Sequence, residues 1–140
     1  MNEILQETEI KQRTIDWLAA FSPGNKPFDF SGLNNLYWPD ERLLAFDTLS
    51  PQTTCIQGWQ TFEAIWKPFM ATLAQWQIEP VGDVLILPGD KIAVAALIWH
   101  GTGTTTAQEP VEITAHATQV WENREGQWRI IHEHISNPVR

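Results

Sequence analysis

Residues 118–136 read TQVWENREGQWRIIHEHIS, a pattern typical of two strands joined by a turn. Apolar and polar residues alternate on both sides of the segment 123–126, as they do in half-buried strands. A glycine at the end of a four-residue turn predicts a bulged hairpin with Gly126 in the left-handed conformation. Closed in this way, the hairpin pairs Asn123 with Gln127 and places His116 opposite His134.

This register divides the side chains of the hairpin between two faces. One face is more apolar and contains small residues: Ala115, Ala117, Trp121, Ile131 and Ile135, with Gln119 and Glu133 as its polar members. The other face carries Thr114, His116, Thr118, Val120, Ile130, His132, His134 and Ser136. We expect the first face to be concave and to line a pocket. A register slip of one residue would move one strand's side chains to the opposite face.

Before this region, apolar residues recur with the spacing of a helix instead of at every second position. An apolar stripe predicts a first helix that ends before Ser22: Ile10, Thr14, Trp17 and Phe21. A second helix begins at Trp59, is kinked at Pro68, and carries one apolar face: Phe62, Ile65, Trp66, Phe69 and Leu73. Strands are expected at 42–47, 54–57, 76–87, 92–102, 111–122 and 127–136. Helices followed by an antiparallel meander predict an α+β architecture.

Composition narrows the class of protein. A chain of 140 residues without an internal repeat or linker predicts a single domain over 1–140. Its net charge of −8 repels phosphate backbones and anionic lipids, which argues against nucleic-acid and membrane partners. Cys55 has no second cysteine with which to form a disulfide. No apolar run reaches the roughly 20 residues that span a bilayer. The first residues lack the basic and apolar segments of a signal peptide. We therefore expect a cytoplasmic location.

The hairpin also resembles a known group. Its glycine, tryptophan, paired histidines and serine are similar to those in the closing hairpin of SnoaL-like domains: Gly126, Trp128, His132, His134 and Ser136. Gly58-Trp59, Phe46-Asp47 and the segment 101–104 fit the same group, so the resemblance extends from about Leu33 onward. SnoaL-like polyketide cyclases and ketosteroid isomerase belong to the nuclear transport factor 2-like superfamily, as does the association domain of calcium/calmodulin-dependent kinase II.

The resemblance implies a cone-shaped, strongly curved antiparallel sheet wrapped around N-terminal helices, the cystatin-like α+β barrel. It also implies a pocket in the cone and a homodimer built on the outer face of the sheet. At the positions of the pocket arginines of the kinase association domain, this chain has Trp99, Gln119 and Ile135. The resemblance therefore does not extend to a site for anionic ligands.

Glu133 is the first candidate for chemistry. Among the apolar side chains of the concave face its carboxylate would be desolvated, which raises the pKa and suits a general acid or base. The alternative is a structural ion pair between Glu133 and Arg129 or another cation near the rim. Asp47 is a second carboxylate, although an aspartate that ends a strand often caps a turn. Tyr37 can donate to an oxyanion from the lip of the cone, or it and Trp38 are packing residues.

We expect the pocket to be largely apolar and to have the usual size of such sites, several hundred cubic ångströms. Its expected lining consists of Trp38 together with residues of the second long helix and the concave face: Trp66, Phe69, Trp99, Ala117, Gln119, Trp121, Ile131 and Ile135. The ligand expected there is a small apolar or carbonyl-containing molecule, and no cofactor is indicated.

The histidines on the opposite face are His116, His132 and His134. They lack the helical spacing and the neighbouring cysteine of common zinc sites, so contacts across a dimer are favoured over a metal. Two function classes remain. One is an isomerase, cyclase or dehydratase that uses Glu133 or Asp47 to carry a proton, and the other is a non-catalytic ligand-binding or oligomerisation module.

Overall fold

A computed structural model describes residues 3–138 of the chain. The N-terminal half contains α1 (Glu3–Ala20), the 3-10 helix η1 (Phe30–Leu33), β1 (Leu44–Asp47), β2 (Cys55–Gln57) and α2 (Trp59–Met70). The C-terminal half contains β3 (Leu73–Pro80), β4 (Leu85–Leu87), β5 (Ile92–Thr105), β6 (Pro110–Arg124) and β7 (Gln127–Ser136). The predicted α+β class, with helices first and a meander of strands after them, is confirmed.

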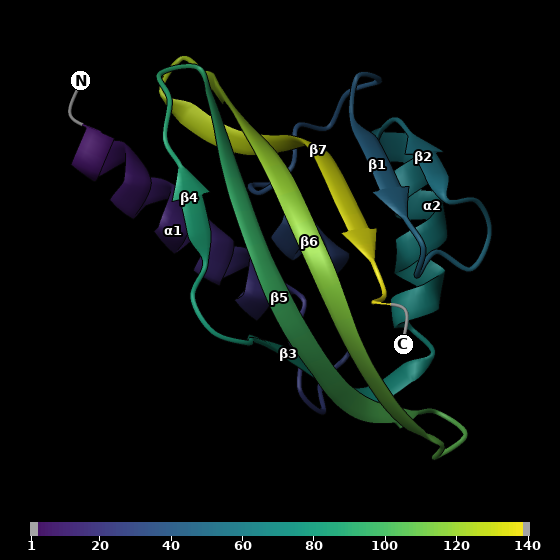
Figure 1. Cartoon of the computed structure of the whole chain (residues 1–140). Helices are drawn as coiled ribbons and strands as arrows, with labels where there is room; N and C mark the ends of the chain where they lie inside the picture. Colours follow the sequence, from purple (N-terminus) through teal and green to yellow (C-terminus); the bar gives the residue numbers. More distant parts are fainter. Residues whose placement is uncertain (1–2, 139–140) are drawn as a thin grey trace.

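Within residues 3–138, seven strands form one curved and unclosed sheet in the order β2-β1-β7-β6-β5-β3, with β4 paired to β5. The paired strands are antiparallel except β1 and β7, which run parallel. Figure 1 shows α1 behind the long strands β5 and β6, with α2 beside β1 and β2. The predicted sheet around N-terminal helices is confirmed, and the parallel pair is the departure from an all-antiparallel sheet. No helix within residues 3–138 is long and apolar enough to cross a membrane.

The closing hairpin has a two-residue turn in place of the predicted four-residue turn. Glu125 and Gly126 both have left-handed backbone conformations, with φ of 53° and 87°. This is the geometry of a type I′ turn, whose twist matches that of the flanking strands. Arg124 therefore pairs with Gln127, so the predicted pairing of Asn123 with Gln127 is wrong. The sequence-based register failed because Glu125, a residue that seldom adopts a positive φ, does so here.

A bulge in β7 compensates for the different turn. Trp121 pairs with Ile130 and Val120 pairs with His132, so Ile131 is an extra residue without a partner on β6. Between the turn and the bulge the predicted faces of β7 are wrong: Ile130 is fully buried, whereas Ile131 is only half-buried.

Beyond the bulge the predicted faces agree with the structure, although the predicted partners do not. The buried side chains there are Ala115, Ala117, Gln119, Glu133 and Ile135. His116 lies opposite Ser136 and His134 lies opposite Thr118, so the predicted pairing of His116 with His134 is wrong. Both histidines are exposed on the outer face. The hairpin thus reaches the expected concave wall by a different route.

Two predicted elements have different ends. The helix α2 ends at Met70, and Leu73 begins β3 instead of extending the helical face. The strand predicted at 76–87 is two strands, β3 and β4, separated by a turn that contains Gly82 with φ 74°. Pro80 lies at the end of β3, an edge strand of the sheet, where a missing N–H does not break a ladder.

Gly103 lets β3 and β5 approach closely. A Cβ atom at this position would overlap the carbonyl group of Gln75 and lie 3.0 Å from the Cα of Trp76. We expect Gly103→Ala to lower the free energy of unfolding by about 1–3 kcal/mol, because backbone must move to admit the methyl group. Urea unfolding measures the change. Gly32→Ala is the control, since nothing lies within 4 Å of its added Cβ. Equal unfolding midpoints for the two variants would contradict this packing.

Candidate functional site

A cavity of about 100 Å³ lies between the two α-helices and the concave face of the sheet. Its walls are mostly aromatic and aliphatic: Trp17, Phe21, Leu49, Phe62, Trp66, Phe69, Met70, Leu73, Trp76, Ile78, Trp99, Val111, Ile113 and Ile135. Two carboxyl-bearing residues complete the lining, Asp47 and Glu133. The cavity is smaller than expected, and its lining includes the rings of Trp17 from α1 and of Phe21, which directly follows α1.

The parallel pairing of β1 with β7 brings the two carboxyl groups to the same wall. Ala45 pairs with Glu133, and Asp47 pairs with Ile135. Side chains two residues apart on a strand share a face, so Asp47 and Glu133 both belong to the concave face. Their exposed fractions are 4% and 1%. A cavity that is otherwise apolar therefore holds two buried acidic side chains.

Tyr37 connects Glu133 to the first helix. The Tyr37 hydroxyl donates a hydrogen bond of 2.6 Å to Oε1 of Glu133. The indole N–H of Trp17 in turn donates to the Tyr37 oxygen at 2.7 Å. Tyr37 is held beside β7 by the segment that follows η1, which forms an isolated bridge to Ile130. The tyrosine thus lies in the core rather than at the lip of the cone.

Burial controls the protonation of these groups. Desolvation raises the pKa of Asp47 to about 7, partly offset by a hydrogen bond from the Leu49 N–H to Oδ1 at 2.8 Å. Desolvation also raises the pKa of Glu133 to about 8; the hydrogen bond from Tyr37 lowers it and the nearby Asp47 charge raises it. The pKa of Tyr37 is raised well above its usual value, chiefly by burial. The pKa values of both carboxyl groups thus lie near neutral pH, well above the ordinary range of a carboxyl group.

No cation pairs with either carboxyl group among residues 3–138. The alternative of an ion pair between Glu133 and Arg129 is wrong, because the Arg129 side chain donates to the backbone of Asn34 and to Gln127. Asp47 accepts a hydrogen bond from the backbone N–H of Leu49, as expected of an aspartate that caps a turn. It also lines the cavity.

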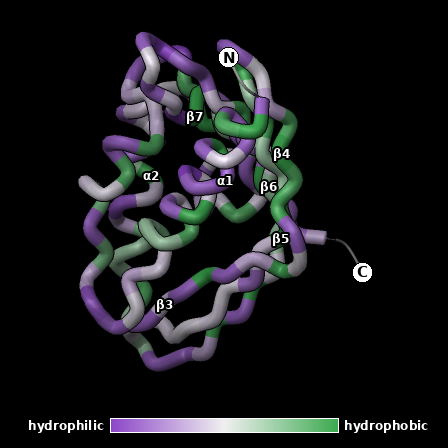
Figure 2. The backbone as a smooth tube through the Cα atoms, turned by 90° about the vertical axis from the view of Figure 1, so that its left-hand side faces the viewer, coloured by the Kyte–Doolittle hydropathy of each residue, from purple (hydrophilic) through white to green (hydrophobic). Residues whose placement is uncertain are grey.

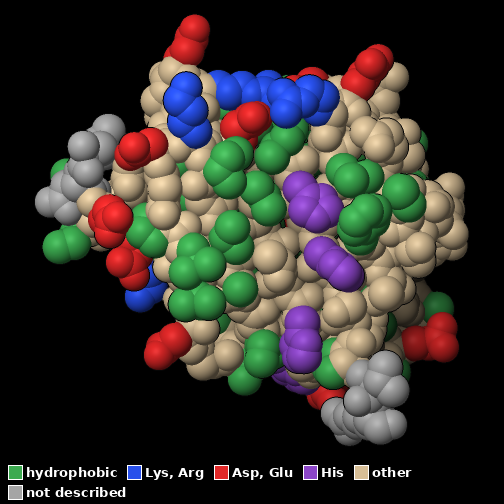
Figure 3. All heavy atoms as spheres, turned by 45° about the horizontal axis from the view of Figure 1, so that its top comes forward, with side chains coloured by type: hydrophobic (Ala, Val, Ile, Leu, Met, Phe, Trp, Pro, Cys, Tyr) green, Lys and Arg blue, Asp and Glu red, His purple; other side chains and the backbone are tan. Residues whose placement is uncertain are grey.

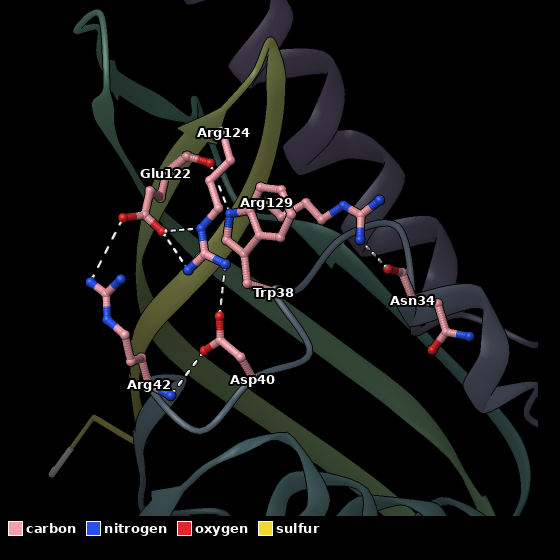
Figure 4. A network of polar contacts seen from close by, with 7 residues as sticks. All are labelled: Asn34, Trp38, Asp40, Arg42, Glu122, Arg124 and Arg129. Carbon is pink, nitrogen blue, oxygen red and sulfur yellow. Dashed lines mark hydrogen bonds and ion pairs between the residues drawn. The ribbon is translucent and has the colours of Figure 1, made fainter.

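Trp38 belongs to a separate cluster at the end of the sheet. The guanidinium groups of Arg124 and Arg129 lie 4.4 and 4.7 Å from the centre of its indole ring. Arg124 also pairs with Asp40 and Glu122, as Figure 4 shows. The predicted place of Trp38 in the cavity wall is thus wrong, because its ring packs under arginines and its N–H donates to the Glu122 carbonyl.

The other predicted pocket residues divide into two groups. Trp66, Phe69, Trp99 and Ile135 line the cavity. Ala117, Gln119 and Trp121 are buried on the concave face but are not part of its lining, and Ile131 is displaced by the bulge. Four buried polar atoms of this face have no hydrogen-bond partner within residues 3–138: Trp99 Nε1, Trp121 Nε1, and both amide atoms of Gln119.

The three candidate interface histidines lie on the outer face of the sheet. His116 and His134 are exposed, whereas His132 is half-buried with its Nδ1 2.7 Å from the Leu44 carbonyl oxygen. Figure 3 shows hydrophobic side chains on both sides of a row of histidines. Across residues 3–138, no group of three or more His, Cys, Asp or Glu side chains could hold a metal ion.

Trp17 is one of the site residues that the sequence pattern missed. It lies on the apolar stripe of the first helix, and that stripe was used only to predict the helix. The signal that could have found it is the stripe itself, because a helix packed inside a curved sheet must present this face to the cavity. Phe21 and Trp76 were missed for the same reason: each reads as an ordinary buried aromatic residue.

A model of the SnoaL-like domain matches residues 10–140 of the chain. The chain belongs to the SnoaL-like family. No curated protein sequence matches this SnoaL-like chain.

Solved structures resemble the SnoaL-like chain over nearly all of its length. A nuclear transport factor 2-like superfamily protein from Salmonella enterica serovar Typhimurium has a TM-score of 0.85 at 20% identity, over 99% of this chain and 95% of its own. A candidate calcium/calmodulin-dependent protein kinase II association domain from Xanthomonas campestris has a TM-score of 0.72 at 26% identity, covering 93% and 86%. A dehydratase candidate from Streptomyces avermitilis has 0.79 at 15% identity, covering 99% and 100%. These likenesses show that the SnoaL-like chain has the nuclear transport factor 2-like fold.

Proposed function

We propose that the chain binds a small apolar or carbonyl-containing molecule in the cavity and moves a proton on it, as an isomerase, cyclase or dehydratase does. One observation carries the proposal: Asp47 and Glu133 are buried on the wall of the same apolar cavity, with no cation beside them among the described residues. Burying carboxyl groups without such partners costs free energy, and groups of this kind concentrate at functional sites.

In the proposed reaction Asp47 is the base. With a pKa of about 7, a substantial fraction of Asp47 is ionised near neutral pH and can take a proton from the carbon next to a carbonyl group. The electron pair of that C–H bond moves toward the carbonyl oxygen, which accepts a hydrogen bond from protonated Glu133. In a substrate with a β,γ double bond, Asp47 then returns the proton to the γ carbon, and the double bond moves into conjugation with the carbonyl group. The product is an isomer, so neither an oxidant nor a reductant is needed.

The walls support a ligand that is small and mostly apolar. The rings of Phe62, Trp66 and Trp99 offer flat apolar surfaces, and the volume of about 100 Å³ admits only a small ring or a short chain. A solved structure similar to this chain is a dehydratase candidate, and loss of water next to a carbonyl group begins with the same proton abstraction.

Cyclohexanone in D₂O is the probe for this function. Its protons next to the carbonyl group exchange slowly in buffer, and proton NMR follows their loss. We expect the wild-type protein to accelerate the exchange at pH 7.5, and the double variant Asp47→Asn, Glu133→Gln to leave it at the buffer rate. Equal rates with wild-type protein, double variant and buffer would count against proton transfer in this cavity. Mass spectrometry of natively purified protein would then identify any ligand that is bound without turnover.

A second candidate function, assembly, is favoured by the outer face of the sheet. Leu85 and Leu87 of β4 are more than half exposed and lie beside Ala96 and Val94 of β5, and Ile98 continues the same apolar surface. Figure 2 shows β4 as a hydrophobic segment of the chain. The likeness to a candidate kinase association domain agrees with an assembly role.

We expect a homodimer through this face at micromolar concentration, because mixed apolar and polar surfaces of this kind are typical of protein interfaces. Light scattering measures the mass. Ile98→Glu should give a monomer with an unchanged far-ultraviolet circular dichroism spectrum, whereas Glu79→Gln, on the edge strand β3, should remain dimeric. A monomeric wild-type protein would exclude this interface.

A further inference from the structure

Three buried side chains from separate parts of the chain form a line of hydrogen bonds. Trp17 lies on α1, Tyr37 follows η1, and Glu133 lies on β7. The indole N–H of Trp17 donates to the Tyr37 oxygen at 2.7 Å, and the tyrosine hydroxyl donates to Oε1 of Glu133 at 2.6 Å. The exposed fractions of the three side chains are 2%, 0% and 1%, so bulk water does not compete for these bonds.

The direction of the line follows from its first member. An indole nitrogen carries one proton and only donates, so the Tyr37 oxygen must accept from Trp17. A tyrosine hydroxyl has a single proton of its own, and Glu133 is its only acceptor within residues 3–138, so that proton is directed to Glu133. Oε1 of Glu133 is then an acceptor whether the carboxyl group is ionised or protonated. When Glu133 holds a proton, the proton is on Oε2.

We propose that Trp17 is a positioning residue for Glu133. Acting through Tyr37, it fixes Oε1 as an acceptor and leaves Oε2 as the atom that holds and releases the proton. The catalytic meaning of this role rests on the proposed proton transfer, but the order of the hydrogen bonds is testable without any substrate.

Other groups around Glu133 do not supply the same control. Tyr37 and Asp47 are the titratable groups that influence it within residues 3–138. Arg13 of α1 donates to the carbonyl groups of Trp128 and Asn35 and is not among the groups that shift the pKa of Glu133. Gln119 lies opposite Glu133 on β6 but forms no hydrogen bond with it. The orientation of the Glu133 carboxyl group therefore depends on the line that begins at Trp17.

The test is a titration of the Glu133 side-chain carbon by NMR in four proteins. Donation by Trp17 polarises the tyrosine hydroxyl and strengthens its bond to the carboxylate. We expect Trp17→Phe to lower the acid dissociation constant of Glu133 by about two- to fourfold, and Tyr37→Phe to lower it by about tenfold or more. In the Tyr37→Phe background, adding Trp17→Phe should change it no further. Trp66→Phe, which removes a second indole from the same cavity, should leave the constant near its wild-type value.

Two results would overturn the proposal. One is an equal effect of Trp17→Phe with and without Tyr37, which would mean that Trp17 acts on Glu133 through packing or solvation alone. The other is an equal effect of Trp66→Phe. If a variant does not fold, the wild-type protein still decides: the Trp17 indole proton resonance should shift with the titration of Glu133, and a resonance that stays constant contradicts the line. If the protein accelerates proton exchange of cyclohexanone but these hydrogen bonds are absent, the proposed function stands and the positioning role of Trp17 falls. If the hydrogen bonds are present but exchange is not accelerated, the positioning role stands and the proposed function falls.

Discussion

Asp47→Asn should slow the protein-catalysed exchange of cyclohexanone protons by about 10²–10⁴-fold, the usual contribution of a positioned general base. The amide has nearly the shape of the carboxyl group, and its oxygen can still accept the Leu49 N–H that Oδ1 accepts in the wild-type protein. What it loses is the ability to take a proton. The expected loss is therefore in turnover. The melting temperature should change little at pH 5, where the wild-type carboxyl group is protonated.

The pH dependence of the same reaction identifies the group. Because the pKa of Asp47 is raised to about 7, the rate should increase as pH rises through this value and Asp47 becomes ionised. It should fall again above about pH 8, where Glu133 loses the proton with which it hydrogen-bonds to the carbonyl oxygen of the ligand. Glu79→Gln, on the exposed face of β3, is the matched control and should retain full activity. An Asp47→Asn protein with wild-type rates would remove Asp47 from the mechanism.

The stability of the fold should decrease between about pH 4 and pH 8. Asp47 and Glu133 have folded-state pKa values of about 7 and 8, above the ordinary values that they regain on unfolding. Both groups are protonated in the folded protein at pH 5, and their contribution to stability is lost as the pH rises through the folded-state values. Since each pKa unit corresponds to about 1.4 kcal/mol, the loss between pH 5 and pH 8.5 is on the order of 5 kcal/mol.

Chemical unfolding at the two pH values measures this loss. Other carboxyl groups also titrate, so the relevant quantity is the difference between the wild-type protein and the double variant Asp47→Asn, Glu133→Gln, which has no ionisable group at either position. The double variant should show a much flatter pH profile. Parallel profiles would mean that the two carboxyl groups do not remain protonated in the folded state.

Local periodicity was sufficient for the fold class and for most of the concave face. The stripes on the two helices and the alternation along β5 to β7 depend on neighbours in sequence, so a sequence pattern records them. The register of the hairpin was not predictable in this way, because the left-handed conformation of Glu125 and the bulge at Ile131 depend on tertiary packing. The two departures compensate for each other, which is why Glu133 has the predicted face with a different partner.

The site itself depended on contacts that no local pattern contains. Asp47 and Glu133 are 86 positions apart and meet only because β1 inserts parallel to β7. Trp17 and Tyr37 meet Glu133 through the packing of α1 inside the sheet. Trp38 shows the reverse case: it was predicted to line the cavity, but two arginines hold its ring at the end of the sheet.

The bulge at Ile131 determines which side chains of β7 face the cavity and which face outward. Because Ile131 has no partner on β6, its removal would leave every pair on either side in place: Trp121 with Ile130, and Val120 with His132. The hairpin thus tolerates a change of one residue in length at this point without turning its acidic side chain outward. In a hairpin of the same architecture without the bulge, the residue equivalent to Glu133 would lie one position nearer the turn glycine. The number of residues between Gly126 and an acidic residue of β7 therefore does not show whether that residue faces the cavity. In related hairpins, the residue equivalent to Glu133 is identified by its pairing partner on β1.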